Sequence, residues 1–116
     1  MAKVRKPRSN KPSAMMIDAA RRLLAELEGT YGRAQMCFAD GIGCTIELKV
    51  SVSRTDDGET ALYVEYERNG YDSVFASQRV KRCTEEEFKE WLITEEAVLQ
   101  VATELQSLYK NTKSWN

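Results

Sequence analysis

The strongest constraint on this fold is a strict alternation of apolar and polar residues in two neighbouring segments, 45–53 and 62–67. The apolar residues at every second position are Ile46, Leu48, Val50, Val52, Leu62, Val64 and Tyr66. A period of two is typical of β-strands that bury one face and leave the other in water. The two segments are therefore predicted to be strands of one half-buried sheet.

The short connection between these strands predicts how they pair. Residues 55–59 read Thr-Asp-Asp-Gly-Glu, which favours a three-residue loop with Gly58 in the left-handed conformation and Thr55 opposite Glu59. This register pairs apolar residues across the strands, namely Leu48 with Tyr66, Val50 with Val64 and Val52 with Leu62. A two-residue loop would instead turn the apolar set of one strand toward water.

A third strand is predicted upstream of this hairpin. Residues 41–43 read Gly-Ile-Gly and offer a second three-residue loop, with positive φ expected at Gly43. The resulting register places Met36 opposite Leu48 and Phe38 opposite Ile46. The apolar residues of the upstream strand then join the same sheet face.

A fourth strand is predicted downstream, from Tyr71 to about Val80. Residues 68–71 read Arg-Asn-Gly-Tyr and favour a tight type I′ turn, which places Phe75 beside Val64 on the core face. Three other apolar residues share the opposite parity: Val74, Ala76 and Val80. A β-bulge would reconcile the two patterns, so the faces of this strand stay open at this point.

Three helices are predicted around the four strands. Their expected N-caps are Ser13, Thr84 with Glu87 as its capping-box partner, and Thr94. The first helix is expected to run for about four turns and to stop at Gly29. Ile93 and Val98 have the spacing of a hydrophobic staple at the start of the last helix. The order α-β-β-β-β-α-α predicts an α+β two-layer sandwich, with a four-stranded antiparallel meander and its helices on one side.

The charge of the chain is divided between a basic beginning and an acidic remainder. Residues 1–12 are predicted to be a flexible basic arm, residues 13–110 a single domain, and residues 111–116 a polar tail. The cations of the arm are Lys3, Arg5, Lys6, Arg8 and Lys11. Residues 12–116 contain the other 12 basic residues and all 18 acidic residues, so they carry a formal charge of −6.

The residue types present argue against an enzyme or a cofactor protein. The chain has no histidine, which excludes Ser-His-Asp and Cys-His catalysis and His-ligated metals. Three cysteines without CxxC spacing indicate a reducing compartment, and we expect a cytoplasmic protein without a secretory signal or membrane span. We therefore expect no catalytic, metal-binding or cofactor-binding residue.

Two acidic groupings are the candidate binding surfaces. The predicted register sets Glu47 opposite Glu67 on the outer sheet face, beside Tyr63, where like charges invite a cation or an arginine from a partner. Six carboxylates also occur within residues 85–96. The candidate partner-binding residues are Glu86, Glu90, Glu95, Glu96, Glu47, Tyr63 and Glu67.

These features predict a small non-enzymatic protein-binding module, an inhibitor or regulator with an acidic surface and an open sheet face. Small, acidic, motif-free proteins of phages and mobile elements, including anti-CRISPR proteins, are similar in type, although no motif is shared. The alternative is a nucleic-acid-binding protein that uses the basic arm, aided by Arg79, Lys81 and Arg82. A homodimer through an edge strand is a further expectation.

Overall fold

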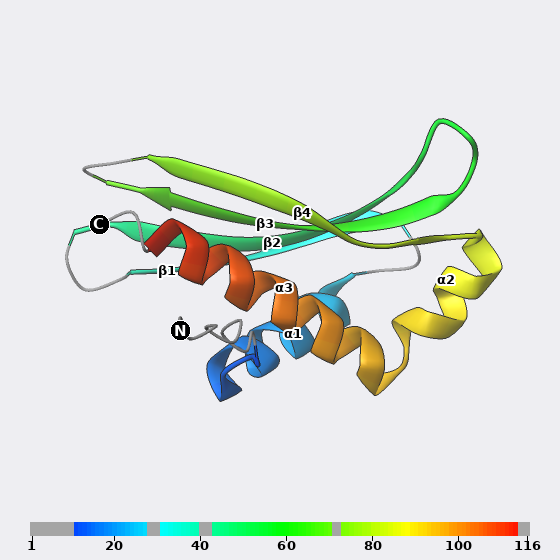
Figure 1. Ribbon diagram of the computed structural model, residues 1–116, viewed down its shortest axis with the longest axis horizontal. Helices are drawn as coiled ribbons and strands as arrows, with labels where there is room; N and C mark the ends of the chain where they lie inside the picture. Colours follow the sequence, from blue (N-terminus) through cyan, green and yellow to red (C-terminus); the bar gives the residue numbers. More distant parts are fainter. Residues whose placement is uncertain (1–10, 28–30, 40–42, 71–72, 114–116) are drawn as a thin grey trace, which may run out of the picture.

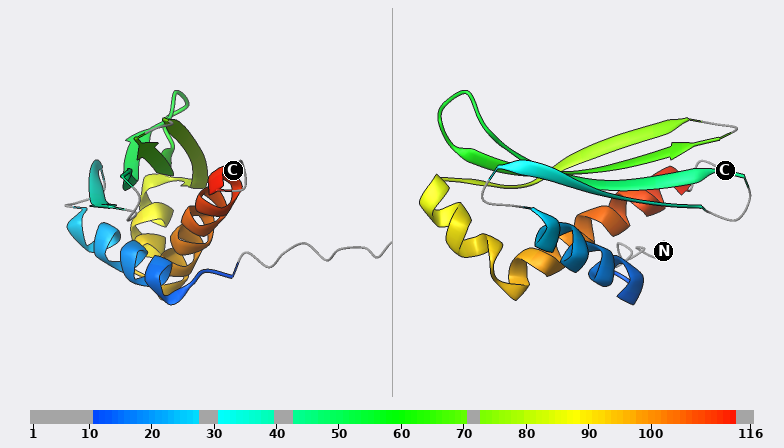
Figure 2. Two further views of the ribbon diagram at one scale, coloured as in Figure 1. Left: turned by 90° about the vertical axis from the view of Figure 1, so that its left-hand side faces the viewer. Right: turned by 180° about the vertical axis from the view of Figure 1, so that it is seen from behind.

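A computed structural model describes residues 11–27, 31–39, 43–70 and 73–113 (Figure 1). The elements are α1 (Ala14–Glu26), β1 (Gly32–Ala39), β2 (Thr45–Arg54), β3 (Thr60–Asn69), β4 (Val74–Cys83), α2 (Glu85–Leu92) and α3 (Glu95–Lys113). The predicted α+β order is confirmed. All three helices lie on one face of the antiparallel sheet, and the other face carries no helix of the described chain (Figure 2).

The central hairpin has the predicted register. Leu48, Val50 and Val52 pair with Tyr66, Val64 and Leu62. In the turn, the Thr55 amide donates to the Glu59 carbonyl at 2.8 Å, the Gly58 amide donates to the Thr55 carbonyl at 3.0 Å, and Gly58 has φ +87°. Local alternation and turn chemistry agree here, so the register follows from the sequence alone.

The pairing of β1 with β2 is also confirmed. Met36 lies opposite Leu48 and Phe38 lies opposite Ile46. Gly43 has the expected positive φ, +93°, whereas residues 41 and 42 lie outside the described residues. β1 and β4 are the two edges of the sheet, which has the strand order β1-β2-β3-β4.

The tight turn predicted between β3 and β4 is wrong. Arg68 pairs with Val74, so five residues lie between the members of this first pair, not two. Phe75 lies opposite Glu67 rather than Val64, and its side chain is 61% exposed. Val74 and Ala76 are packed against the core instead. Burial of these side chains outweighs the local preference of the Asn-Gly sequence for a two-residue turn.

β4 carries a bulge at Val80, although it does not bring Phe75 to the core face. Leu62 pairs with Lys81 and Tyr63 pairs with Arg79, which leaves Val80 as the extra residue of β4. Val80 shares the parity of Val74 and Ala76, so the longer connection, and not the bulge, sets these three residues toward the core.

The core lies between the inner sheet face and the helices. Its largest fully buried side chains are Tyr66, Phe88, Met16, Leu23, Leu48, Leu62 and Leu105. Tyr66 meets Tyr109 of α3 edge to face with the ring centroids 6.0 Å apart, and Phe88 contacts Trp91 at 5.4 Å. α1 and α3 cover the sheet. α2 packs against β3 and β4 at the end of the molecule where β2 turns into β3 (Figure 1).

The three expected N-caps, Ser13, Thr84 and Thr94, bond as predicted. The Ser13 hydroxyl accepts from the Met16 amide at 3.2 Å, and both hydrogen bonds of the Thr84–Glu87 capping box are present. The expected stop at Gly29 lies outside the described residues, as does most of the basic arm. α3 runs to Lys113, three residues beyond the predicted domain boundary. No helix of the described chain is long and apolar enough to cross a membrane.

Candidate functional site

The facing carboxylates of the outer sheet face are compensated from within the chain. Glu47 and Glu67 are directly opposite, as predicted. The Lys49 ammonium lies 3.4 Å from a Glu47 oxygen and 3.2 Å from a Glu67 oxygen. The hydrogen bond to Glu67 is the main reason that the pKa of Lys49 is raised. Lys49 therefore supplies one cation to the two like charges, and the group of three side chains keeps a net charge of −1.

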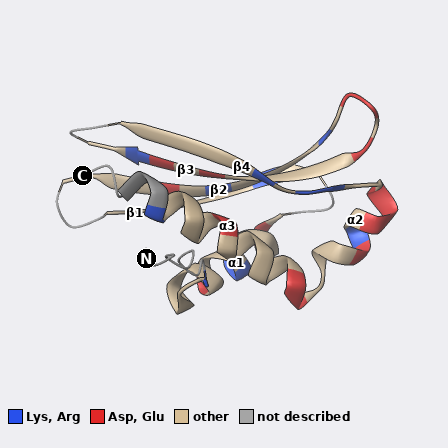
Figure 3. Ribbon diagram, viewed as in Figure 1, with Lys and Arg blue, Asp and Glu red and all other residues tan. Residues whose placement is uncertain are grey.

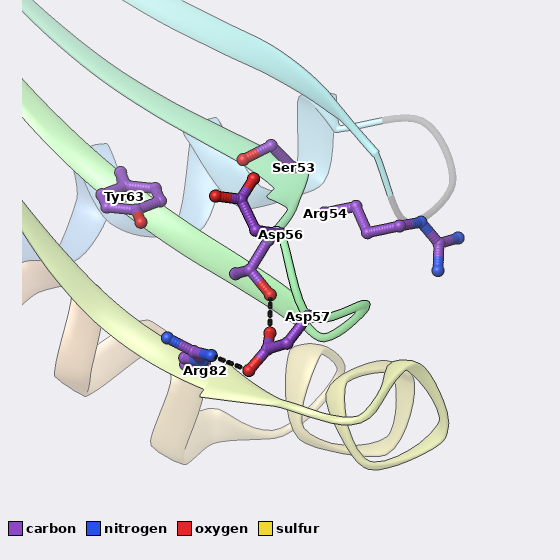
Figure 4. A pocket seen from close by; sticks show the side chains of 7 residues that line it. Ser53, Arg54, Asp56, Asp57, Tyr63 and Arg82 are labelled. Atoms are coloured by element: carbon purple, nitrogen blue, oxygen red, sulfur yellow. Dashed lines mark hydrogen bonds and ion pairs between the residues drawn. The ribbon is translucent and has the colours of Figure 1, made fainter.

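Tyr63 borders a polar hollow of about 400 Å³ at the end of the central hairpin (Figure 4). Arg82 crosses this hollow and forms ion pairs with Asp57 and Glu59. The pKa of Asp57 is lowered, first by its hydrogen bond from Thr55 and then by Arg82. The ion pairs of Arg82 join β4 to the hairpin turn and its following strand, so they stabilise this end of the sheet.

Three of the six clustered carboxylates have structural partners. Glu85 accepts hydrogen bonds from Tyr31 and Arg54, and Glu87 completes the capping box. Glu95 receives both terminal nitrogens of Arg21, at 2.9 and 2.7 Å, and this pairing lowers the pKa of Glu95. Glu95 is thus engaged by Arg21, while 60% of its side chain stays exposed.

The other three carboxylates point into solvent on α2 and α3. Glu86 and Glu90 are exposed and form no ion pair or side-chain hydrogen bond with the described residues. Glu96 is exposed and accepts only from Gln100 of its own helix, at 3.0 Å. Acidic residues dominate α2 and the start of α3, as Figure 3 shows. The dipoles at the two helix N-termini stabilise Glu86 and Glu96, whereas Glu90 lies in the last turn of α2.

The expected staple between Ile93 and Val98 is wrong, and Ile93 instead belongs to the exposed surface. Ile93 is 86% exposed, whereas Val98 is buried. Thr94 does cap α3, because its hydroxyl accepts from the Ala97 amide at 3.2 Å. Ile93 is the C-cap of α2 and lies seven residues beyond Glu86. This spacing sets it with the exposed glutamates, on the face opposite the buried Phe88.

A shallow groove of about 330 Å³ lies between α3 and β4. Its lining residues are Val80, Glu96, Leu99, Gln100, Thr103 and Glu104. Leu99 is 44% exposed, so the groove presents an apolar side chain between two carboxylates. Glu96 is shared by the groove and the α2–α3 turn. We call Glu86, Glu90, Ile93, Glu96 and this groove the acidic corner.

Ile93 and Leu99 are exposed residues that were not expected at the surface. Phe88, Trp91 and Leu92 already define the apolar face of α2 at helical spacing. Ile93 falls outside that face, and its seven-residue distance from Glu86 was the signal that could have placed it with the acidic residues.

The basic residues expected to help bind nucleic acid do not form one surface. Lys81 lies over the Trp91 ring, 5.5 Å from its centroid, and Arg82 is engaged by Asp57 and Glu59. Arg79 is exposed on the outer sheet face. Of the five cations of the arm, only Lys11 is within the described residues.

The described residues contain no group of three or more His, Cys, Asp and Glu side chains that could hold a metal ion. No disulfide joins Cys37, Cys44 or Cys83, and desolvation raises the pKa of Cys83. No protein-family model matches the chain, and neither the curated proteins nor the solved structures gave a match. The arrangement of surface residues is therefore the basis for assigning a function.

Proposed function

We propose that this protein is a non-enzymatic protein-binding module, an inhibitor or regulator whose acidic corner docks on a basic protein surface. The observation that carries the proposal is the exposure of Ile93 among carboxylates that have no partner of opposite charge in the described chain. A lone exposed apolar side chain is ordinary. An exposed isoleucine that shares a helix face with Glu86 and Glu90 gives a partner both an apolar anchor and charge.

The groove supports the same kind of partner. It continues the acidic corner along α3 and exposes Leu99 between Glu96 and Glu104. A partner segment with basic residues around an apolar side chain would match both the charge and the apolar floor of the groove. The lysines or arginines of such a segment would meet Glu96 and Glu104, the two carboxylates that line the groove.

The proposal extends to the setting in which the protein acts. The absence of disulfides supports a reducing compartment such as the cytoplasm. One role for an acidic surface is to inhibit a nucleic-acid-binding protein, as in the phage inhibitors that are similar in type. The acidic surface would occupy the site where that protein binds phosphate.

The test is affinity capture from the source cells with three forms of the full chain. Wild type is compared with the double variant Glu86→Lys/Glu90→Lys and with Asp18→Lys/Glu26→Lys, which makes the same change of net charge on exposed positions of α1. We expect the α2 variant to lose the partner and the α1 variant to retain it. Equal recovery by all three forms contradicts the acidic corner.

A second variant separates the apolar anchor from the charge. Ile93→Ser removes a side chain that is 86% exposed, so the free energy of unfolding should change by no more than about 0.5 kcal/mol. We expect the affinity for the captured partner to fall, and to fall equally at low and high salt because no charge is removed. Unchanged affinity shows that Ile93 is not an anchor.

A further inference from the structure

The two edges of the sheet differ in how they are protected from pairing with another strand. β4 carries the bulge at Val80 and the cations Arg79, Lys81 and Arg82, which are common devices against edge-to-edge association. β1 pairs with β2 through eight consecutive residues without a bulge. Residues 34–39 contain no charge, proline or glycine. β1 is therefore the edge that is open to an added strand.

The side chains of β1 increase in size along the strand on the inner face. The inner-face residues in chain order are Gly32, Ala34, Met36 and Phe38. A Cβ built on Gly32 meets no atom within 4 Å, so there is open space above this glycine. An antiparallel copy of the same strand, centred on Gln35, would place Phe38 over Gly32 and Met36 against Ala34. Each large side chain would then meet a small one.

We propose that β1 pairs with β1 of a second copy of this chain, antiparallel and with Gln35 opposite Gln35, to form one continuous eight-stranded sheet. The amide of Gln35 is exposed and can both donate to and accept from its counterpart. A pair centred on Met36 would set Phe38 opposite Ala34, and a pair centred on Cys37 would set Phe38 opposite Met36. In neither register does a large side chain lie opposite Gly32. An odd register would join the core face of one copy to the wet face of the other.

Charge on the outer face fits the same register. Arg33 is exposed and forms no ion pair or side-chain hydrogen bond with the described residues. In the pair centred on Gln35, Arg33 of each copy lies opposite Cys37 of the other, one strand away from Glu47. The long arginine side chain can extend across Cys37 toward that carboxylate, and the contact occurs twice by symmetry. Arg33 of one copy thus extends the cross-strand row that contains Glu47 and Glu67 of the other copy.

The experiment is sedimentation of the full chain over a range of concentrations. We expect a reversible dimer of twice the 13.2 kDa chain mass. Gln35→Lys and Gln35→Glu each set two like charges face to face, so each should weaken the dimer by about fivefold, and an equimolar mixture of the two should restore it. A monomer at every attainable concentration overturns the proposal.

The matched control is Ser77→Lys, which lies at the opposite end of the same cross-strand row, on β4. We expect this variant to dimerise as wild type does. If Ser77→Lys weakens the dimer and Gln35→Lys does not, the interface lies at β4 and the proposal is wrong. Thermal unfolding of each variant, followed by circular dichroism, verifies that the exposed positions leave the fold intact.

The register has its own test with a short thiol-to-thiol cross-linker. Gln35→Cys in a Cys37→Ser background should link the two copies, because position 35 lies on the symmetry axis. In wild type the two Cys37 side chains would be offset by four residues, about 13 Å along the strand, and should not link. Linkage through Cys37 and not through position 35 overturns the register.

Discussion

At the scale of the residue, Gly58 determines how the central hairpin turns. It has φ +87°, a conformation that L side chains rarely adopt, and nothing lies within 4 Å of an added Cβ. The cost of a substitution is therefore backbone strain alone. This turn holds Thr55 opposite Glu59, and the pairing of β2 and β3 depends on that position.

Gly58→Ala is expected to lower the free energy of unfolding by about 1 kcal/mol, because alanine is strained at this φ. Gly58→Asn should lower it less, since asparagine tolerates the left-handed region. Asp56→Ala, at the exposed start of the same turn, serves as the control and should change little. Urea unfolding measures all three, and equal losses at positions 56 and 58 would contradict the turn geometry.

At the scale of the element, α1 is tied to α3 at its first turn and again past its middle. The Ser13 amide donates to the Gln106 side chain at 3.0 Å, and Arg21 forms its two-point contact with Glu95. The contact with Arg21 holds the pKa of Glu95 below its ordinary value of 4.5. A carboxyl whose pKa is lowered by folding stabilises the folded state above its unfolded pKa, and this contribution is lost as the pH falls through the folded value.

Arg21→Met is therefore expected to be slightly less stable than wild type at pH 7, by an amount that salt reduces. The difference should shrink as the pH falls below about 4.5 and Glu95 becomes protonated in both folded proteins. Arg22→Met is the control, because Arg22 makes only a 3.9 Å contact with Asp18 of its own helix. Urea midpoints at a series of pH values measure the effect, and a difference that persists in acid contradicts this origin.

At the scale of the whole molecule, charge is separated between the first residues and the rest of the chain. The five cations of residues 1–11 precede a remainder with a formal charge of −6. Such a remainder repels phosphate, so binding of nucleic acid would depend on the basic segment. The acidic corner, in contrast, belongs to the folded domain and does not need that segment.

Deletion of residues 1–10 is expected to leave the melting temperature unchanged, since this segment has no apolar periodicity that would pack on the core. Any affinity for a DNA or RNA oligonucleotide should fall steeply with salt and disappear on deletion. Binding to the partner captured by the acidic corner should survive. A fall of several degrees in the melting temperature would show that the segment packs against the domain.

The sequence by itself determined the helix caps, the strand order and the register of β1, β2 and β3. Strict alternation around a turn whose glycine must be left-handed leaves one pairing that buries both apolar sets, and this information is local. Serine and threonine caps are equally local, since each hydroxyl bonds an amide three residues away. The acidic segment of the candidate site was likewise visible as a run of glutamates.

Only the tertiary structure decided which of those residues are accessible to a partner. Lys49 pairs with both Glu47 and Glu67, and Arg21, which is distant in the sequence, engages Glu95. The connection to β4 is longer than its Asn-Gly sequence favours, because Val74 and Ala76 gain burial against the core. Ile93 is exposed because the turn between two helices directs it outward. Each outcome depends on packing between residues far apart in the chain, which no local pattern contains.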